Sequence, residues 1–280
     1  MKILVTGSTG FIGRHIVPVL LQQRHEITAT ARNLDRARSM PWFDKVKFVA
    51  CDLHHTGQCL SEIFDTPDLL IHLAWTGLPN YRALFHFESN LPADYNFLKN
   101  MVNSGTKHLL VTGTCFEYGM QSGQLSEDMI TLPANPYGLA KDTLRKILEI
   151  MQKHHPFVLQ WLRLFYLYGP GQNPSSLIAQ LDKAIDNAEP VFNMSGGEQL
   201  RDYLPVHEVA RRIDFLINNP QCCGVINCCS GEPISVRRLV ENRLRERGAT
   251  LQLNLGYYPY PDYEPMAFWG DSQKLDNCMS

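Results

Sequence analysis

A tyrosine and a lysine lie four residues apart in the segment Asn135–Lys141. Asn135 suits the N-cap of a helix and Pro136 suits its first position, so Tyr137 and Lys141 would share one helix face. A free tyrosine has a pKa of about 10, and a neighbouring ammonium group is expected to lower it. Such a pair can exchange a proton with an alcohol or a carbonyl oxygen. The same spacing is also frequent by chance on ordinary amphipathic helices.

A threonine precedes this helix, just after an expected strand at His108–Thr112. Thr114 could donate its hydroxyl to the same substrate oxygen that Tyr137 would protonate. The alternative is a hydroxyl at a strand end that only caps a turn. The position of these residues after a fifth strand, downstream of a nucleotide-binding turn, favours the catalytic interpretation.

That nucleotide-binding turn is the segment Thr6–Gly13, which has glycines at positions 7, 10 and 13. It follows an expected strand and opens an expected helix, the context that a dinucleotide fingerprint requires. Glycines let the backbone approach a pyrophosphate, and the helix N-terminus offers free N–H groups to that anion. A tight strand-to-helix connection is the alternative. The cofactor contacts expected in this turn are Gly7, Thr9, Gly10, Phe11 and Ile12.

The end of the second expected strand indicates which dinucleotide binds. NAD enzymes place an acidic residue there for the ribose hydroxyls, but this sequence has Arg32. Without a carboxylate a 2′-phosphate is not repelled, and Arg32 can pair with it, so NADP(H) is favoured and NAD(H) stays possible. A solvated arginine on a loop is the alternative. Asp52 is expected near the adenine, where its alternative is a turn residue. The remaining expected cofactor contacts are Leu53, Leu73, Ala74 and Lys141.

Short apolar runs alternate with helical patterns along the chain, which predicts an α/β fold of the doubly wound Rossmann type with a parallel sheet. Strands are expected at Lys2–Thr6, Glu26–Ala31, Lys47–Cys51, Leu69–Ala74, His108–Thr112, Val158–Phe165 and Gly224–Cys229. Helices are expected at Ile12–Gln22, Ala83–Asn103, Tyr137–Lys153 and Ser176–Asn187, with a kink at Pro18 in the first. We predict a dinucleotide-binding domain from residues 1–165 plus 206–235. A small discontinuous substrate lobe is expected from 166–205 plus 236–280, its tail a loop rich in tyrosine and proline.

The 280 residues carry a formal net charge of -2, so no basic excess argues for a nucleic-acid partner. No apolar run reaches the roughly 18 residues of a membrane span, and the N-terminal run is too short for a signal peptide. We therefore expect a soluble, cytoplasmic protein.

Eight cysteines are present, four of them crowded between Cys222 and Cys229. Their spacing fits no zinc pattern, and successive side chains of a strand point to opposite faces. We expect small core residues in a reducing cytosol, and no metal site. The other four, Cys51, Cys59, Cys115 and Cys278, are scattered.

Together these motifs resemble the extended, or atypical, short-chain dehydrogenase/reductases, especially the NAD-dependent epimerase/dehydratase family, over nearly the whole chain. The resemblance implies that Lys141 binds the nicotinamide ribose, Tyr137 is the acid/base and Thr114 polarises the reacting C–O bond. It also implies that Arg201 meets the nucleotide phosphates, with a salt bridge in the neighbourhood of Asp202 as the alternative. The segments that carry the resemblance are Thr6–Gly13, Leu70–Ala74, Asn90, Thr114, Tyr137, Lys141, Leu162–Gly171, Gly197–Tyr203, Asn227 and Ser230–Pro233. The substrate contacts that follow are Thr114, Cys115, Phe116, Tyr137, Tyr166 and Arg201.

Two departures from the family pattern matter. Tyr166 replaces an asparagine, which puts the usual contact with the substrate pyrophosphate in doubt. Dehydratase members have an Asp-Glu pair after the catalytic threonine, whereas this chain has Cys115 and Phe116. Glu117 comes one position too late and should face away. Dehydration is therefore not expected.

Three functions remain: reduction of a nucleotide-linked 4-keto-6-deoxy sugar, epimerisation of a nucleotide sugar, and a catalytically silent dinucleotide sensor. Intact Thr114, Tyr137 and Lys141 disfavour the sensor, and Arg32 favours the reductase. The resemblance also implies a homodimer formed by the helices at Ala83–Asn103 and Tyr137–Lys153. Leu98, Met101, Leu144 and Leu148 suit either that interface or the face toward the sheet.

Overall fold

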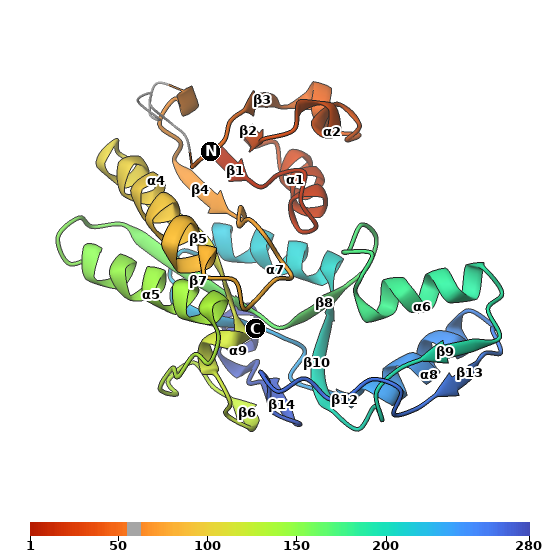
Figure 1. The fold of residues 1–280 in the computed structure, drawn as a ribbon. Coiled ribbons are helices and arrows are strands. Elements are labelled where there is room, and N and C mark those ends of the chain that lie inside the picture. Colours follow the sequence, from red (N-terminus) through yellow and green to blue (C-terminus); the bar gives the residue numbers. More distant parts are fainter. Residues whose placement is uncertain (55–62) are drawn as a thin grey trace.

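The computed structural model describes residues 1–54 and 63–280 and is built around a seven-stranded parallel sheet (Figure 1). Its strand order is β11-β7-β5-β4-β1-β2-β3, which confirms the predicted α/β class and the Rossmann-like doubly wound sheet. The strands are β1 (Lys2–Thr6), β2 (Glu26–Ala31), β3 (Lys47–Ala50), β4 (Leu69–His72), β5 (His108–Thr114), β7 (Val158–Leu164) and β11 (Gly224–Cys228).

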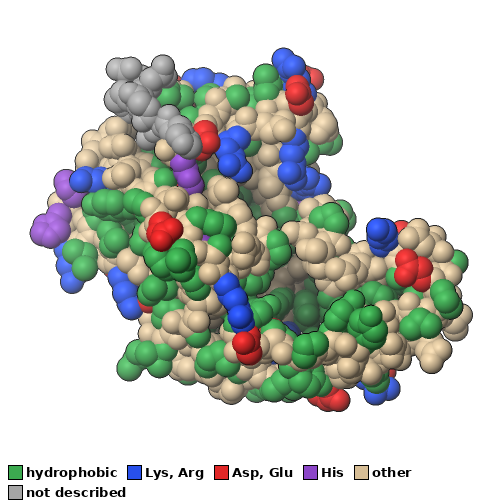
Figure 2. All heavy atoms as spheres, viewed as in Figure 1, with side chains coloured by type: hydrophobic (Ala, Val, Ile, Leu, Met, Phe, Trp, Pro, Cys, Tyr) green, Lys and Arg blue, Asp and Glu red, His purple; other side chains and the backbone are tan. Residues whose placement is uncertain are grey.

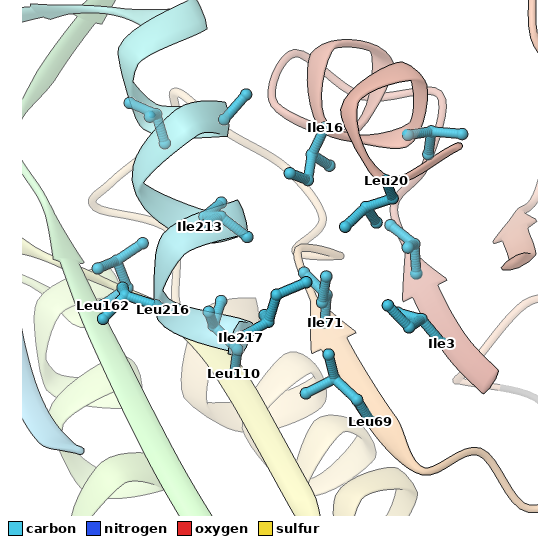
Figure 3. Close-up of a cluster of buried hydrophobic side chains, with 14 of the residues drawn as sticks. Ile3, Ile16, Leu20, Leu69, Ile71, Leu110, Leu162, Ile213, Leu216 and Ile217 are labelled. Carbon is cyan, nitrogen blue, oxygen red and sulfur yellow. The ribbon is translucent and has the colours of Figure 1, made fainter. Parts of the chain in front are cut away.

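Successive residues of the sheet strands face opposite helical layers, as the period of two requires. Ile3 and Val5 of β1 pack in a cluster under α1 (Gly13–Gln22) and α7 (Val206–Asn218), the layer drawn in Figure 3. Leu4, between them in sequence, packs in the opposite cluster under α4 (Leu91–Asn103) and α5 (Pro136–Met151). Helix α1 passes through Pro18 and continues to Gln22.

The packing of α4 and α5 shows on which side of these helices four apolar side chains lie. Leu98 and Met101 of α4 and Leu144 and Leu148 of α5 are all fully buried in this chain's own core. Their positions allowed either a dimer interface or the face toward the sheet, and these four side chains face the sheet. The expected helix Ala83–Asn103 is shorter: a π-helical turn, η2 (His86–Asn90), precedes α4.

A smaller cluster lies away from the main sheet, at lower right in Figure 1. Two helices, α6 (Leu177–Asp186) and α8 (Val236–Glu246), pack with two short paired strands, β9 (Val191–Asn193) and β13 (Gln252–Asn254). A three-stranded sheet, β12-β10-β8, combines β8 (Tyr166–Tyr168), β10 (Leu200–Pro205) and β12 (Pro233–Ser235). The division into two domains stays a prediction.

The C-terminal segment returns to the main sheet. β14 (Phe268–Gly270) pairs with β6 (Gly123–Leu125), and α9 (Gln273–Met279) contacts β11. The remaining short helices are α2 (Leu34–Arg38), η1 (Phe43–Lys45) and η3 (Cys115–Tyr118). None of the helices in the described ranges is long and apolar enough to cross a membrane.

Because α9 packs beside β11, one of the cysteines expected to be a reduced core residue is instead in a disulfide. Cys222 forms a disulfide with Cys278, and their Cα atoms are 6.1 Å apart. The bond joins the start of β11 to the last helix across 56 residues, a pairing that the sequence spacing does not reveal. Cys228 and Cys229 are free and buried as expected, whereas Cys223 is free but exposed. Cys59 lies outside the described residues.

Candidate active site

A cavity of about 930 Å³ opens at the carboxyl ends of β1, β2 and β4. The strand order reverses beside β1, and ligands of doubly wound sheets bind at such a reversal. Figure 2 shows a hollow between the upper part of the molecule and the smaller cluster at lower right. The predicted cofactor residues that line the cavity are Gly7, Thr9, Gly10, Phe11, Arg32, Asp52, Leu53, Leu73 and Ala74. Ile12 instead packs against the hydrophobic core.

The glycine turn leaves no room for side chains. Gly7 has a φ of +64°, and a Cβ atom there would come 2.9 Å from the Ala74 backbone nitrogen. A Cβ atom on Gly13 would approach the Gly7 carbonyl oxygen to 2.4 Å. This close backbone contact brings the start of α1 against the end of β4. The turn therefore fits a pyrophosphate held by backbone N–H groups at a helix N-terminus.

Three arginines line the cavity: Arg14, Arg32 and Arg36. Arg32 and Arg36 are exposed, while Arg14 is half-buried against Gly171, whose absent side chain makes room for the guanidinium group. Within the described part of the chain, Nε of Arg14 is buried and has no hydrogen-bond partner. Burial and the nearby charge of Arg36 both lower the pKa of Arg14. These features favour an anionic ligand such as a phosphate.

Sequence reasoning missed Arg14 and Arg36. Arg14 directly follows the third glycine of the fingerprint, and Arg36 follows Arg32 by four residues, so both signals were present. It also missed the loop after β8, which approaches the cavity from the smaller cluster. The further lining residues are Thr30, Ala31, Asn33, Cys51, His54, Trp75, Thr76, Leu78, Asp94, Gly171, Gln172, Asn173 and Pro174.

The motif at the end of β4 is held by side-chain hydrogen bonds. The Thr6 hydroxyl oxygen accepts from the backbone N–H groups of Leu73 and Ala74, each at 3.2 Å, and lies 3.0 Å from Nδ1 of His72. Nε2 of His72 faces Asp94 Oδ1 at 3.4 Å, and both side chains are buried. The cavity floor is therefore fixed by β1 and β4 together.

The three predicted catalytic residues lie outside the cavity lining but next to it, because Trp75, which lines the cavity, contacts both Tyr137 and Lys141. All three are nearly buried, with exposed fractions of 5% for Thr114, 7% for Tyr137 and 1% for Lys141. Thr114 caps η3, its hydroxyl oxygen accepting from the Phe116 backbone N–H at 3.3 Å. Nζ of Lys141 donates to the Thr112 carbonyl at 2.8 Å and sits 3.9 Å from the centre of the Trp75 ring. Burial lowers the pKa of Lys141 to about 8, although Asp94 and Glu117 oppose this shift.

The pKa expected for Tyr137 is wrong in direction. Burial raises it above the ordinary value, and the hydrogen bond with Thr114 only partly opposes this. The rings of Trp75, Tyr81 and Phe116 lie 5.9, 5.6 and 6.3 Å from the Tyr137 ring, so they exclude water from the phenol. The Lys141 ammonium group donates one hydrogen bond to the Thr112 carbonyl. Burial in this aromatic wall therefore favours the protonated phenol over the phenolate.

Glu117 is fully buried behind the catalytic turn. Its Oε1 accepts from the Thr114 backbone N–H and from Trp161 Nε1, both at 2.9 Å, and its Oε2 accepts from Arg163 Nε at 2.7 Å. A Cβ atom on Gly113 would come 2.4 Å from Glu117 Oε1, so glycine is required there. Glu117 therefore fixes the backbone of Thr114 and does not take part in the cavity.

Two of the predicted substrate residues follow Thr114 but have different surroundings. The Phe116 ring lies 4.8 Å from Tyr81 and 6.2 Å from Tyr263, centre to centre. Cys115 is buried in a separate apolar cluster with Phe165 and Phe268, and burial raises the pKa of its thiol. Phe116 therefore belongs to the aromatic wall around Tyr137, whereas Cys115 packs beneath the turn.

The other two predicted substrate residues, Tyr166 and Arg201, meet a carboxylate that sequence reasoning missed. Arg201 Nη2 lies 2.9 Å from Glu264 Oε1, and the Tyr166 hydroxyl donates to Glu264 Oε2. Asp202 turns the other way, where it is buried and accepts from Ser230 and Gly231. An internal salt bridge of Arg201 therefore exists, with Glu264 as its partner.

Comparison with known proteins places this geometry in a family. Residues 3–229 match the NAD dependent epimerase/dehydratase family. The chain is 30% identical over 272 residues to a dTDP-6-deoxy-L-talose 4-dehydrogenase (NAD(+)) of Aggregatibacter actinomycetemcomitans, a match covering 96% of this chain and 99% of that protein. It is 28% identical over 307 residues to a UDP-glucose 4-epimerase of Halalkalibacterium halodurans, covering 100% and 90%.

A solved structure agrees with these sequence matches. The structure of MoeE5 in complex with UDP-glucuronic acid and NAD has a TM-score of 0.84 and 25% identity, and the match covers 99% of this chain and 92% of that one. The chain therefore belongs to the NAD-dependent epimerase/dehydratase family and is an enzyme of the extended short-chain dehydrogenase/reductase type.

Proposed function

We propose that this protein reduces the 4-keto group of a nucleotide-linked 4-keto-6-deoxy sugar, such as dTDP-4-keto-6-deoxyglucose, to a hydroxyl group. The observation that carries the proposal is the Tyr137 phenol, which lies beside Thr114 and near Lys141 in a water-poor aromatic wall. Reduction needs a proton donor at this place. The relative at 30% identity is named for chemistry at the same carbon of a dTDP-linked 6-deoxy sugar.

The step balances with the groups that line the site. A reduced nicotinamide dinucleotide, when bound, would supply the hydride that forms the new C–H bond at the keto carbon. The Tyr137 hydroxyl gives its proton to the keto oxygen as that oxygen gains charge. Thr114 orients the same oxygen, and Lys141 holds the ribose beside Tyr137. The departing proton is replaced from solvent before the next turnover.

Dehydration is not part of the proposal, because Cys115 and Phe116 supply no acid/base pair next to Thr114. Cys115 is buried in an apolar cluster, and its thiol pKa is raised. Incubation with dTDP-glucose and oxidised cofactor should leave no 4-keto-6-deoxy product detectable by mass spectrometry. Formation of that product would show that the enzyme dehydrates and would contradict this interpretation of Cys115 and Phe116.

The cofactor we favour is NADP(H), and NAD(H) remains the second candidate. No carboxylate ends β2, and Arg14, Arg32 and Arg36 all line the cavity. A 2′-phosphate would find charged donors there. NAD is supported by the names of relatives, which include an NAD(+)-dependent dehydrogenase and a structure containing NAD.

Epimerisation at C4 is the alternative function, because a UDP-glucose 4-epimerase is 28% identical over the full chain. An epimerase returns its hydride to the same sugar and consumes no cofactor. Purified enzyme mixed with dTDP-4-keto-6-deoxyglucose should consume one NADPH for each 6-deoxy sugar formed. Constant NADPH during interconversion of UDP-hexoses at C4 would instead establish the epimerase.

We also propose a homodimer through α4 and α5. The three leucines and the methionine considered for its surface are buried in the core. The interface would therefore use exposed residues such as Leu139 and Ile150 of α5. Light scattering at micromolar concentration should give twice the chain mass of 31.9 kDa. A monomeric mass would contradict the proposal.

A further inference from the structure

Trp75, in the loop after β4, contacts both catalytic side chains of α5. Its side chain lines the cavity, and its ring centre lies 3.9 Å from Nζ of Lys141 and 5.9 Å from the centre of the Tyr137 ring. Lys141 itself is 1% exposed and lies outside the cavity lining. One face of the indole therefore lies against the buried ammonium group, next to the cavity.

The Lys141 ammonium group is a buried charge with little compensation. It has three N–H bonds, and the hydrogen bond that it makes in the described part of the chain goes to the Thr112 carbonyl at 2.8 Å. The carboxylates of Asp94 and Glu117 act on its charge, but each lies against another basic side chain. The face of an aromatic ring attracts a cation, most strongly where both are desolvated. The indole therefore supplies part of the stabilisation that water gives to an exposed ammonium group.

A buried histidine fixes the indole ring. Trp75 Nε1 donates to Nδ1 of His86 at 3.0 Å, and the two rings are stacked with their centres 6.1 Å apart. Nε2 of His86 lies 2.8 Å from the Asn80 carbonyl oxygen. An indole N–H only donates and a carbonyl oxygen only accepts, so these partners assign the neutral ring with its proton on Nε2. Burial and the charge of Lys141 lower the pKa of His86, although the hydrogen bond with Asn80 opposes them.

The turn η2 also holds the residue after Trp75. Asn90 lies four residues after His86, and its Nδ2 donates to the Thr76 carbonyl at 2.9 Å. His86 and Asn90 are 0% and 2% exposed, so both hydrogen bonds to the loop are buried. One short turn of the chain therefore sets the position of the indole.

We propose that Trp75 is a positioning residue of the catalytic site: its indole face holds the Lys141 ammonium group against the Thr112 carbonyl, and neutral His86 holds the indole. The kinetic consequence rests on the proposed function, in which Tyr137 becomes a phenolate when it gives its proton to the keto oxygen. A nearby ammonium group stabilises that phenolate. The contact with Trp75 therefore keeps the ammonium form available as the pH rises.

The direct test observes Lys141 in the enzyme without cofactor or substrate. Lysine labelled with ¹³C at Cε is incorporated, and the Lys141 signal is the one lost in Lys141→Arg. In the natural enzyme the indole ring current should shift this signal upfield. Its titration midpoint should fall by about one pH unit in Trp75→Leu, because the cation–π contact opposes the lowering that burial causes. Trp75→Phe keeps an aromatic face, so its midpoint should lie between the two.

The kinetic test follows the alkaline limb of kcat/KM for NADPH-dependent reduction. This limb should move to lower pH in the same order, from the natural enzyme through Trp75→Phe to Trp75→Leu. His86→Leu leaves the indole N–H without its acceptor and should move the limb in the same direction by less. The other titratable groups around Lys141, which the Trp75 variants retain, are His86, Asp94, Glu117 and Tyr137.

Trp42→Phe is the matched control, since Trp42 is a buried tryptophan in the core cluster on the other face of the sheet. It should leave the Lys141 midpoint and the alkaline limb unchanged, even where it lowers stability. A Lys141 signal with no ring-current shift in the natural enzyme would overturn the inference, and this measurement decides it even where Trp75→Leu does not fold. Equal midpoints in the natural enzyme and both Trp75 variants would also overturn it. If the natural enzyme oxidises no NADPH with the keto sugar, the proposed function fails, and the NMR titration still decides the role of Trp75.

Discussion

The two walls of the site satisfy their polar groups in different ways. The cofactor wall, formed by the glycine turn and the ends of β2 and β4, presents exposed Arg32 and Arg36 and a buried Arg14 Nε with no partner in the described part of the chain. The catalytic wall, formed by η3, β8, β10 and the 263–266 segment, pairs its charges internally. Glu117 binds Arg163, and Glu264 binds Arg201.

This difference in charge pairing predicts how each wall responds to substitution. A charged group whose donors await a ligand contributes to binding and little to folding. A buried charge paired inside the protein contributes to folding, because removing its partner leaves it uncompensated. Substitutions on the first wall should therefore change affinity alone, whereas substitutions on the second should change stability as well.

The largest expected effect lies where the walls meet, at Tyr137. Tyr137→Phe removes only the phenolic hydroxyl, and turnover should fall about 10²–10⁴-fold, the usual contribution of a general acid–base group. Cofactor affinity, measured by fluorescence titration, should stay within about twofold because the hydroxyl does not line the dinucleotide cavity. Turnover near that of the natural enzyme would remove Tyr137 from the mechanism.

Glu117→Gln should give the next largest effect, on stability. It leaves Arg163, which is 1% exposed, without a charged partner, and breaking such a pair costs about 3–5 kcal/mol. The free energy of unfolding in urea should fall by that amount. Glu149→Gln is the control: Glu149 pairs with Arg145 but is 39% exposed, so its loss should cost less than about 1 kcal/mol. Equal losses of unfolding free energy in both variants would contradict the claim that the buried ion pair contributes more to stability than the exposed one.

Arg32→Asp should give the smallest effect, confined to cofactor choice. One charged hydrogen bond contributes about 1.5–3 kcal/mol, so the preference for NADPH over NADH should fall about tenfold or more. Unfolding free energy should not change, since the side chain is exposed. Arg38→Asp, at the end of the neighbouring helix α2 with its guanidinium group facing Asp35, should leave the preference unchanged. Unaltered selectivity in Arg32→Asp would mean that this residue does not read a phosphate.

Local patterns predicted the sheet well and picked out residues that line one cavity, because both depend on neighbours in sequence. β1 and β2 have the expected bounds. β4 ends at His72 and not at Ala74, because the Leu73 and Ala74 N–H groups donate to Thr6 in place of a neighbouring strand. β5 runs two residues further than expected, because Gly113 and Thr114 pair with β7.

The ion pairs of the catalytic wall could not be predicted in the same way, because the residues that pair are distant along the chain. Glu264 is 63 residues from Arg201 and 98 from Tyr166, and nothing in its local sequence marks it. The disulfide between Cys222 and Cys278 was hidden for the same reason. The pKa of Tyr137 was misjudged because the rings that desolvate it come from two other segments, the loop after β4 and η3.

The most direct test of net reduction is to follow the hydride itself. The enzyme is incubated with dTDP-4-keto-6-deoxyglucose and NADPH carrying deuterium at both C4 positions, and the sugar product is analysed by mass spectrometry and NMR. The account predicts one deuterium at sugar C4 for each NADPH oxidised. C4 interconversion of UDP-glucose and UDP-galactose with no deuterium gained and no NADPH consumed would contradict it.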